Sequence, residues 1–371
     1  MFEQTKYYLC SILSFFFGRI GDDTMNNIKE QVKDYYGKQL QSNKDLKTNS
    51  CCCTKGPSAE VKDILPLIAD EIKDRFYGCG SPLPPLLEGM TVLDLGCGTG
   101  RDVYIASKLV GESGHVIGVD MTKEQIDVAI KYQEEQRKRF GFKTSNVKFS
   151  QGYIEDLRSL GIEDQSVDVI ISNCVINLSP EKEQVFREIY RVLRPGGELF
   201  FSDVFVDRRI PEHLATDPVL HGECLGGAMY IEDFRRLMVK VGFTDFRYTS
   251  ITDIELRNEE IENRIGIANF TSRTVRAFKL DDLEDICEDY GQAAWYDGSI
   301  PGYPHFFDLD DHHRLITNKP MLVCGNTASM LSNTRYGRAF KVTGDRSVHY
   351  GKFDCGKPED KTCGSKSGSC C

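Results

Sequence analysis

Short apolar runs alternate with longer amphipathic segments along the chain from Met90 onward. The apolar runs have the composition of buried strands, and they cover residues 91–96, 115–120, 147–152, 167–175 and 197–204. Between them, apolar residues recur at helical spacing over residues 101–110, 122–141 and 180–197. This alternation predicts right-handed βαβ units and an α/β, Rossmann-like fold whose mostly parallel sheet is covered on both faces.

The pattern changes near Arg247. Residues 246–256 and 268–280 favour strands, residues 280–291 favour a short helix, and the aromatic and Gly-rich stretch that follows is less regular. We therefore expect a smaller C-terminal α+β domain. The final residues are rich in Lys, Ser and Gly and have too little apolar content to pack. The expected parts are a N-terminal arm with a mobile Cys-rich segment, a cofactor domain, an accessory domain and a disordered Cys-containing tail, at residues 1–60, 61–246, 247–345 and 346–371.

The amino-acid composition of the chain limits which partners and which cellular compartment can be expected. The net charge of −10 argues against a partner that presents a phosphate backbone, so we expect no nucleic acid. The 14 cysteines are scattered and partly adjacent, which is poor geometry for a disulfide framework, so reduced thiols and a cytoplasmic location are expected. The apolar stretch near the N-terminus is shorter than the ~20 residues that span a bilayer, so no membrane partner is expected.

The segment "VLDLGCGTGRD" (residues 92–102) follows a predicted strand and opens a predicted helix. Its glycines allow a tight turn and a close approach of the backbone to a ligand. The next strand ends in Asp120, where an acid can accept hydrogen bonds from a ribose diol. Two cofactors remain open: a dinucleotide, or S-adenosylmethionine. The compressed G-x-G-x-G spacing and the adjacent Asp94 favour S-adenosylmethionine, because an acid attracts its cationic groups and repels a diphosphate.

Three cysteines are placed to meet at the carboxyl edge of this sheet. Cys174 lies near the end of the fourth strand, Cys79 lies between two glycines before the first strand, and Cys224 follows the fifth strand. Cys174 taken alone could equally be a small buried hydrophobic residue. Three converging thiolates instead select a soft ion. Trivalent arsenic binds three sulfurs and keeps a lone pair that can attack a methyl carbon without a general base.

The motifs "FYGCGSP", "DLGCGTGRD", "SNCVINL", "GECLGGA" and "VCGNT" together resemble the arsenite methyltransferase family, and the fold resembles class I S-adenosylmethionine-dependent methyltransferases. The resemblance extends from Val32 to the region of Tyr336. It implies a cytoplasmic enzyme of arsenic detoxification that methylates arsenite and methylarsenite, presented as glutathione or other thiol adducts, to mono- and dimethylated arsenicals. It also implies thioredoxin or glutathione as the reductant.

The resemblance assigns roles to individual residues. Four functional cysteines are implied, of which Cys174 and Cys224 bind arsenic throughout, Cys79 is a third ligand or a disulfide partner, and Cys51 is a resolving thiol. The "CCC" at residues 51–53 departs from the family pattern and leaves Cys51 the least secure. The implied cofactor contacts are Asp94, Gly96 and Gly98 at the methionine moiety, Asp120 and Met121 at the ribose and adenine, Ile154 and Glu155 at the adenine, and Tyr77, Asn173 and Val175 elsewhere in the pocket.

The remaining candidate ligands have simpler explanations. Cys97 is expected to fill the glycine turn, and Cys287 and Cys324 are expected to be core or loop thiols. No role is assigned to the cysteines of the C-terminal stretch. His312 and His313 follow acidic residues, and we expect them to be solvated or hydrogen-bonded rather than metal ligands.

Two alternative functions remain open. The first is a methyltransferase for a small organic acceptor, for which the fold and the "RVLRPGG" motif would suffice and Cys174→Ser would keep activity. The second is a thiol-based metalloid-binding protein, which would bind arsenite without forming a methylated product.

Overall fold

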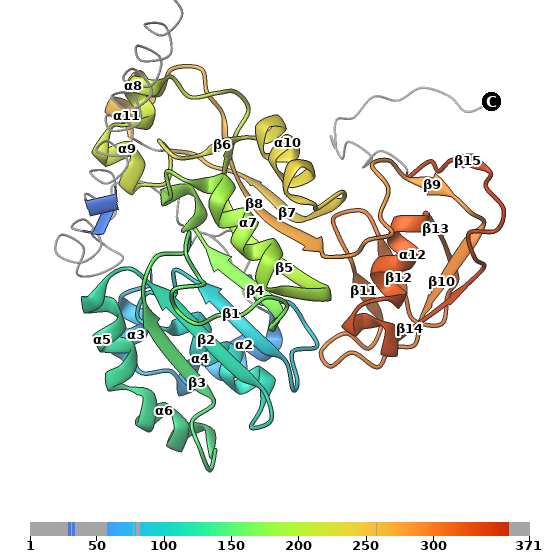
Figure 1. Ribbon diagram of the computed structural model, residues 1–371, viewed down its shortest axis with the longest axis horizontal. Helices are drawn as coiled ribbons and strands as arrows, with labels where there is room; N and C mark the ends of the chain where they lie inside the picture. Colours follow the sequence, from blue (N-terminus) through green and yellow to red (C-terminus); the bar gives the residue numbers. More distant parts are fainter. Residues whose placement is uncertain are drawn as a thin grey trace, which may run out of the picture.

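The computed structural model describes residues 29–30, 32–33, 58–76, 78, 82–256 and 258–355. Its largest element is a sheet of eight strands in the order β3-β2-β1-β4-β5-β8-β7, with β6 paired to β5. The parallel part consists of β1 (Thr91–Leu95), β2 (His115–Asp120), β3 (Val147–Gln151), β4 (Val167–Asn173) and β5 (Leu193–Val206). The five strands expected from the apolar runs are therefore confirmed (Figure 1).

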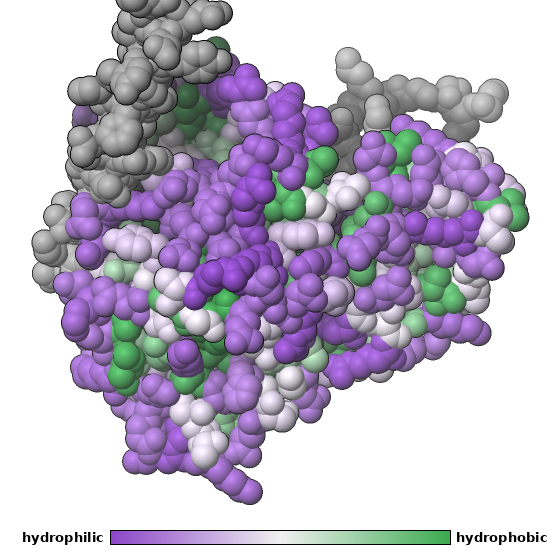
Figure 2. Space-filling model, in the orientation of Figure 1, coloured by the Kyte–Doolittle hydropathy of each residue, from purple (hydrophilic) through white to green (hydrophobic). Residues whose placement is uncertain are grey.

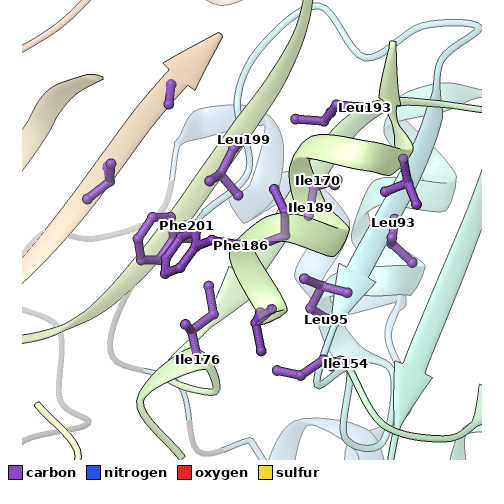
Figure 3. Close-up of a cluster of buried hydrophobic side chains, with 14 of the residues drawn as sticks. Leu93, Leu95, Ile154, Ile170, Ile176, Phe186, Ile189, Leu193, Leu199 and Phe201 are labelled. Carbon is purple, nitrogen blue, oxygen red and sulfur yellow. The ribbon is translucent and has the colours of Figure 1, made fainter. Parts of the chain in front are cut away.

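Helices cover both faces of this sheet, and alternate residues of each strand face opposite sides. On one face, Leu93 and Ile170 pack against α7 (Lys182–Val192), as Figure 3 shows, and α10 (Ile231–Val241) contributes to the same cluster. On the other face, Val92 and Val169 pack with a set of helices that comprises α2 (Ala59–Ile64), α3 (Asp70–Asp74), α4 (Arg101–Val110), α5 (Lys123–Lys131) and α6 (Gln133–Phe140). Both faces are thus buried, which explains the nearly continuous apolar runs of the strands.

The predicted helices form with small changes at their ends. The segment 122–141 divides into α5 and α6 at Tyr132, and α6 ends at Gly141, whose left-handed backbone caps the helix. The segment 180–197 ends as a helix at Val192, because the following "LRPGG" already belongs to β5. A short 3-10 turn, η3 (Leu65–Leu67), and another, η4 (Ile176–Leu178), join the longer elements.

The strands expected after Arg247 also form, but they extend the large sheet. β7 (Phe246–Asp253) and β8 (Phe270–Phe278) run antiparallel to each other, and β8 pairs with β5 from Glu198 to Val206. The short β6 (Met229–Tyr230) and the helices α8 (Glu212–Ala215), α9 (Pro218–Gly222) and α11 (Glu259–Ile265) lie between these strands in sequence. We therefore propose that the smaller C-terminal unit begins after Phe278 rather than at residue 247.

The C-terminal unit is built from short antiparallel strands around one helix, and it packs beside the large sheet (Figure 1). Its elements are β9 (Glu288–Asp289), β10 (Gln292–Tyr296), β11 (Phe306–Asp308), β12 (Arg314–Ile316), β13 (Met321–Val323), α12 (Gly325–Ser332), η5 (Arg335–Arg338), β14 (Phe340–Thr343) and β15 (Gly351–Lys352). Strands β13, β10 and β14 form a three-stranded sheet over an apolar core. The expected α+β character is confirmed.

The prediction of a short helix at residues 280–291 is wrong. Turns and irregular backbone occupy this segment, and its last residues form β9, in which Glu288 and Asp289 pair with Lys352 and Gly351. The Glu284 N–H bonds to the Asn326 side chain 2.8 Å away, so a distant residue satisfies a backbone group that a helix would use internally. Tertiary pairing therefore overrides a weak helical pattern here.

No helix in the described part of the chain is long and apolar enough to cross a membrane. The face of the molecule shown in Figure 2 is largely hydrophilic, with small apolar areas between the polar side chains. The expected N-terminal arm and C-terminal tail fall largely outside the described residues, and the domain division of the chain stays a prediction.

Candidate active site

A cavity of about 1020 Å³, part of it open to solvent, lies at the carboxyl ends of β1, β2 and β4. This is the edge at which ligands bind in open parallel sheets. Nine of the residues expected to contact the cofactor line it together: Asp94, Gly96, Gly98, Asp120, Met121, Ile154, Glu155, Asn173 and Val175. Cys174 lines the same cavity. Tyr77, Cys51 and Cys79 lie outside the described residues, so the structure says nothing of their predicted roles.

The glycine loop wraps the floor of the cavity because its glycines have backbone angles that other residues rarely adopt. Gly96, Gly98 and Gly100 have φ values of +73°, +53° and +87°. A Cβ atom at Gly96 would lie 2.3 Å from the methyl carbons of Val175, so this position also requires the absence of a side chain. The loop thereby brings main chain, rather than side chains, against any ligand in the cavity.

Three carboxyl groups gather beside this loop. Burial raises the pKa of Asp94 well above its usual range, and the nearby carboxylates of Asp102 and Asp120 raise it further. Such a cluster is electrostatically unfavourable when all three groups are ionised, and a cationic ligand would relieve it. The amino group and sulfonium of S-adenosylmethionine are cations of the required kind, whereas a diphosphate would add to the repulsion.

Asp120 is fixed by the backbone around it. One of its carboxylate oxygens accepts a hydrogen bond from the Gly98 N–H at 2.9 Å, and the other accepts one from the Thr122 N–H at 2.8 Å. Burial raises the pKa of Asp120, and these N–H donors oppose that shift. The carboxylate therefore ties the glycine loop to the end of β2 and keeps lone pairs available at the cavity wall, as a ribose-binding acid requires.

Arg101 and Asp102 are cavity residues that the sequence reasoning missed. The Arg101 guanidinium stacks on the Phe76 ring at 3.6 Å from its centroid. Asp102 accepts a hydrogen bond from Asn173 Nδ2 at 3.1 Å, and its other oxygen forms an ion pair with Arg101 Nη1 at 3.6 Å. Neither of these two paired atoms has a hydrogen-bond partner among the described residues, so both keep hydrogen-bonding capacity that a ligand with carboxylate and ammonium groups would use. The sequence does contain a sign of these two cavity residues, because Arg101 and Asp102 form a charged pair that directly follows the glycine loop.

Glu155 closes another part of the wall. Its carboxylate accepts a hydrogen bond from the Ser179 hydroxyl at 2.7 Å and forms an ion pair with Lys29 at 3.4 Å. Ile154 beside it is buried in the core cluster of Figure 3. This neighbourhood of an apolar residue and a fixed carboxylate is suited to an adenine ring, which stacks on apolar surface and donates hydrogen bonds.

Cys174 and Cys224 lie against each other beside the cavity. The Cys224 sulfur is 3.3 Å from the backbone carbonyl oxygen of Cys174, and both residues are buried. Both also have left-handed backbone conformations, with φ values of +58° and +61°. Such angles cost a residue with a side chain ~1 kcal/mol or more and gather at functional sites. Cys174 is disulfide-bonded in this structure.

Charged groups surround the cysteine pair from the neighbouring elements. Lys182, at the start of α7, experiences the negative charges of Asp203, Cys224 and Glu155, while burial lowers its pKa to about 8. Asp203 is buried, and its carboxylate accepts hydrogen bonds from the N–H groups of Val204 and Asn177 at 2.9 and 3.1 Å. Burial nevertheless raises the pKa of Asp203 to about 7. Two ionisable side chains with shifted pKa values, Lys182 and Asp203, therefore lie in the neighbourhood of the cysteine pair.

The other candidate ligands noted in the sequence are Cys97, His312 and His313. Burial, with the nearby Asp120 and Asp94, raises the pKa of the Cys97 thiol, which keeps it protonated in the glycine turn. Asp310 accepts hydrogen bonds from the N–H groups of His312 and His313 and from the His313 ring at 2.8 Å. It also forms ion pairs with Arg247 and with the ring of His312. The two histidines are thus hydrogen-bonded, and with Asp310 they also lie close enough together to hold a metal ion, so the expectation that they bind no metal stays a prediction.

The order of the parallel sheet, the glycine loop and the acid-lined cavity together define a class I S-adenosylmethionine-dependent methyltransferase. A family model for a methyltransferase domain matches residues 86–242, and a model for the arsenite methyltransferase C-terminal domain matches residues 290–371. The arsenite methyltransferase of Aquipseudomonas alcaligenes is 51% identical, over 92% of this chain and 99% of its own length. The human arsenite methyltransferase is 42% identical, over 85% of this chain and 84% of its own.

A solved structure agrees with these relatives. The crystal structure of an arsenic(III) S-adenosylmethionine methyltransferase from Chlamydomonas reinhardtii is 53% identical and covers 81% of this chain and 100% of its own, with a TM-score of 0.78. The chain therefore belongs to the arsenite methyltransferase family. S-adenosylmethionine is its cofactor.

Proposed function

We propose that this enzyme transfers the methyl group of S-adenosylmethionine to trivalent arsenic held by the thiolates of Cys174 and Cys224. The observation that carries the proposal is the position of Cys174. It directly follows β4 in the wall of the cofactor cavity and is in direct contact with Cys224. A substrate that is bound by sulfur at this point lies next to the methyl group, and catalysis then consists mainly of correct approach geometry.

The cavity residues orient the methyl donor. Asp94 and Asp102 hold the cationic amino group, Arg101 pairs with the carboxylate, and Asp120 accepts hydrogen bonds from the ribose hydroxyls. Because Gly96 has no side chain, the main chain there leaves room for the cofactor beside Val175. These contacts would fix the direction in which the methyl group points, and the thiolates would fix the arsenic opposite the leaving sulfur.

The chemistry of the site favours arsenic over an organic acceptor. An oxygen, nitrogen or carbon acceptor generally needs a base to remove a proton, and the described residues that line the cavity include no histidine. Of the four carboxylates among these residues, those of Asp102, Asp120 and Glu155 already accept hydrogen bonds from a side chain or the backbone. Trivalent arsenic needs no base, because its lone pair attacks the methyl carbon directly. Glutathione or other thiol adducts of arsenite and methylarsenite would enter by exchange of thiols, giving mono- and dimethylated products for detoxification.

A reductant is part of the proposed cycle. Cys174 is disulfide-bonded in this structure, and a sulfur in a disulfide has no thiolate to offer to arsenic. Thioredoxin or glutathione would supply the two electrons that release it. We further propose Cys79 as the third ligand or disulfide partner and Cys51 as the resolving thiol, roles that come from the family resemblance.

The test is product formation by purified full-length enzyme with labelled S-adenosylmethionine, arsenite and glutathione. Wild type should form methylarsenicals, whereas Cys174→Ser and Cys224→Ser should lose at least ~100-fold of the rate. Cys10→Ser, which removes a thiol far away in sequence, is the matched control and should keep it. Calorimetry should show that both active-site variants still bind S-adenosylmethionine, which excludes misfolding.

The alternative functions give different results in the same assay. Methylation of an organic acceptor by Cys174→Ser would contradict the thiolate mechanism. Arsenite binding by fully reduced wild type without any methylated product would instead identify a metalloid-binding protein.

A further inference from the structure

Three cysteines meet in the C-terminal unit, away from the cofactor cavity. The sulfur atoms of Cys287, Cys324 and Cys355 all lie within 4.8 Å of one another. None of the three lines the cavity at the end of the large sheet. From the sequence, Cys287 and Cys324 are expected to be core or loop thiols and Cys355 has no expected role, so their convergence is a finding of the structure. We call these three residues the C-terminal thiol cluster.

Strand pairing brings the cluster together. Cys287 directly precedes β9, and Cys355 follows β15, which pairs antiparallel with β9. The Phe353 N–H also bonds to the Cys287 carbonyl oxygen at 2.8 Å, so the chain is held against Cys287 just before it reaches Cys355. Cys324 arrives separately, at the junction of β13 and α12. Three segments distant in sequence therefore deliver one sulfur each.

The surroundings of Cys324 stabilise negative charge on its sulfur. Cys324 is the N-cap of α12, and its sulfur accepts a hydrogen bond from the Thr327 N–H at 3.4 Å. The buried guanidinium of Arg247 reaches the same sulfur at 4.0 Å. Cys324 is fully buried, whereas Cys287 and Cys355 are only partly buried. The cluster thus has a buried base at Cys324 and a partly exposed rim through which an ion can enter.

We propose that the C-terminal thiol cluster is a second binding site for trivalent arsenic, separate from the catalytic cysteines. Three sulfurs around one point match the pyramidal coordination of trivalent arsenic. Zinc in structural sites takes four ligands, and no further Cys, His, Asp or Glu among the described residues joins the cluster. Arsenic bound to three thiolates is a neutral unit, which suits a site where Asp245 and Asp310 already compensate the charge of Arg247.

Binding is an exchange of ligands without electron transfer. Arsenous acid carries three hydroxyl groups, and each thiol forms one As–S bond as one As–O bond breaks. The thiol proton leaves with the hydroxide as water, so three waters are released and arsenic stays trivalent. No oxidant or reductant is needed once the three thiols are reduced. The C-terminal thiol cluster would therefore bind arsenite whether or not methyl transfer takes place at the catalytic cysteines.

The test measures arsenic content in full-length protein that carries Cys174→Ser and Cys224→Ser, so that the catalytic pair cannot contribute. The protein is reduced with a phosphine, incubated with arsenite, desalted and analysed for arsenic per chain. Adding Cys287→Ser should remove about one arsenic per chain, because two thiols bind much more weakly than three. Cys355→Ser should do the same. Both positions are partly exposed, so their substitution should leave the fold intact.

Cys10→Ser in the same background is the matched control, and it should retain the arsenic content. X-ray absorption at the arsenic edge should show three sulfur neighbours in the background protein, and fewer per arsenic after Cys287→Ser. An arsenic content that is unchanged by Cys287→Ser and Cys355→Ser would overturn the proposal. Stoichiometric zinc that depends on Cys287 and is not displaced by arsenite would overturn it as well.

Discussion

The sulfur of Cys224 lies 3.3 Å from the carbonyl oxygen of Cys174, and both cysteines hold left-handed backbone angles. Neither angle is needed to continue a strand or a helix, since Cys174 lies just past the end of β4 and Cys224 lies just past α9. The fold therefore accepts local strain at the two residues that we propose bind arsenic. Strain at such positions is maintained by the packing around them.

This strain can be measured by comparing Cys224→Gly with Cys224→Ala. At an ordinary position glycine is the less stable of the two by about 0.5–1 kcal/mol. At a φ of +61°, glycine avoids the steric cost that alanine keeps, so we expect Cys224→Gly to equal or exceed Cys224→Ala in free energy of unfolding. Denaturant unfolding of both variants gives the values. A clear advantage for alanine would show that the angle is not strained.

Gly96→Ala should weaken cofactor binding. Its new methyl group would meet Val175 at 2.3 Å, and the φ of +73° is unfavourable for alanine. Gly141→Ala is the matched control, because Gly141 has a left-handed backbone with a φ of +76° but open space around it. Both variants should lose about 1 kcal/mol from the backbone term, and only Gly96→Ala should also lose affinity for S-adenosylmethionine, by at least ~10-fold. Equal affinity of the two variants, measured by calorimetry, would show that the loop adapts.

Asp203 should make stability depend on pH. Burial raises its pKa to about 7, against ~3.9 in an unfolded chain. The folded protein therefore holds this proton more tightly. The stabilisation is fully present below about pH 4 and is lost as the pH rises to about 7, with an upper limit of ~4 kcal/mol.

Asp203→Asn removes this titration. The free energy of unfolding of wild type, relative to that of Asp203→Asn, should fall between pH 4 and pH 7.5. Asp281→Asn changes an exposed carboxyl and serves as the control. A difference between wild type and Asp203→Asn that stays constant over this pH range would mean that Asp203 remains ionised throughout.

Glu198→Gln should weaken the contact between the large sheet and the C-terminal unit. Glu198 is completely buried in β5, and its carboxylate binds Arg276 at 2.7 Å and also pairs with Arg335 of η5. Removing its charge leaves two buried guanidinium groups uncompensated, which should cost about 3–5 kcal/mol of unfolding free energy. Asp308→Asn, which breaks an exposed pair with Arg314, should cost less than ~1 kcal/mol. A similar cost for both variants in denaturant unfolding would contradict this assignment.

The sequence alone determined the parallel sheet and the cofactor loop, because both rest on local signals. Apolar runs such as residues 167–175 predict strands through burial on both faces, and the glycines between Asp94 and Asp102 predict a tight loop through their backbone freedom. The order of strands along the chain then placed Asp120 and Cys174 at one edge of the sheet, where the structure has them lining one cavity.

Only the tertiary structure decided features that depend on distant pairing. Residues 280–291 carry a weak helical pattern, yet pairing with residues 351–352 makes their end a strand. The same pairing brings Cys287 and Cys355 together, and Cys324 joins them from the start of α12, although their separation in sequence gives no sign of a common site. The left-handed angle at Cys174 is equally invisible in the sequence, since a residue with a side chain adopts it only when surrounding contacts compensate its cost. Local sequence preferences determine each helix or strand to within a few residues of its ends. Contacts between segments distant in sequence determine how these elements pair and which side chains they bring together.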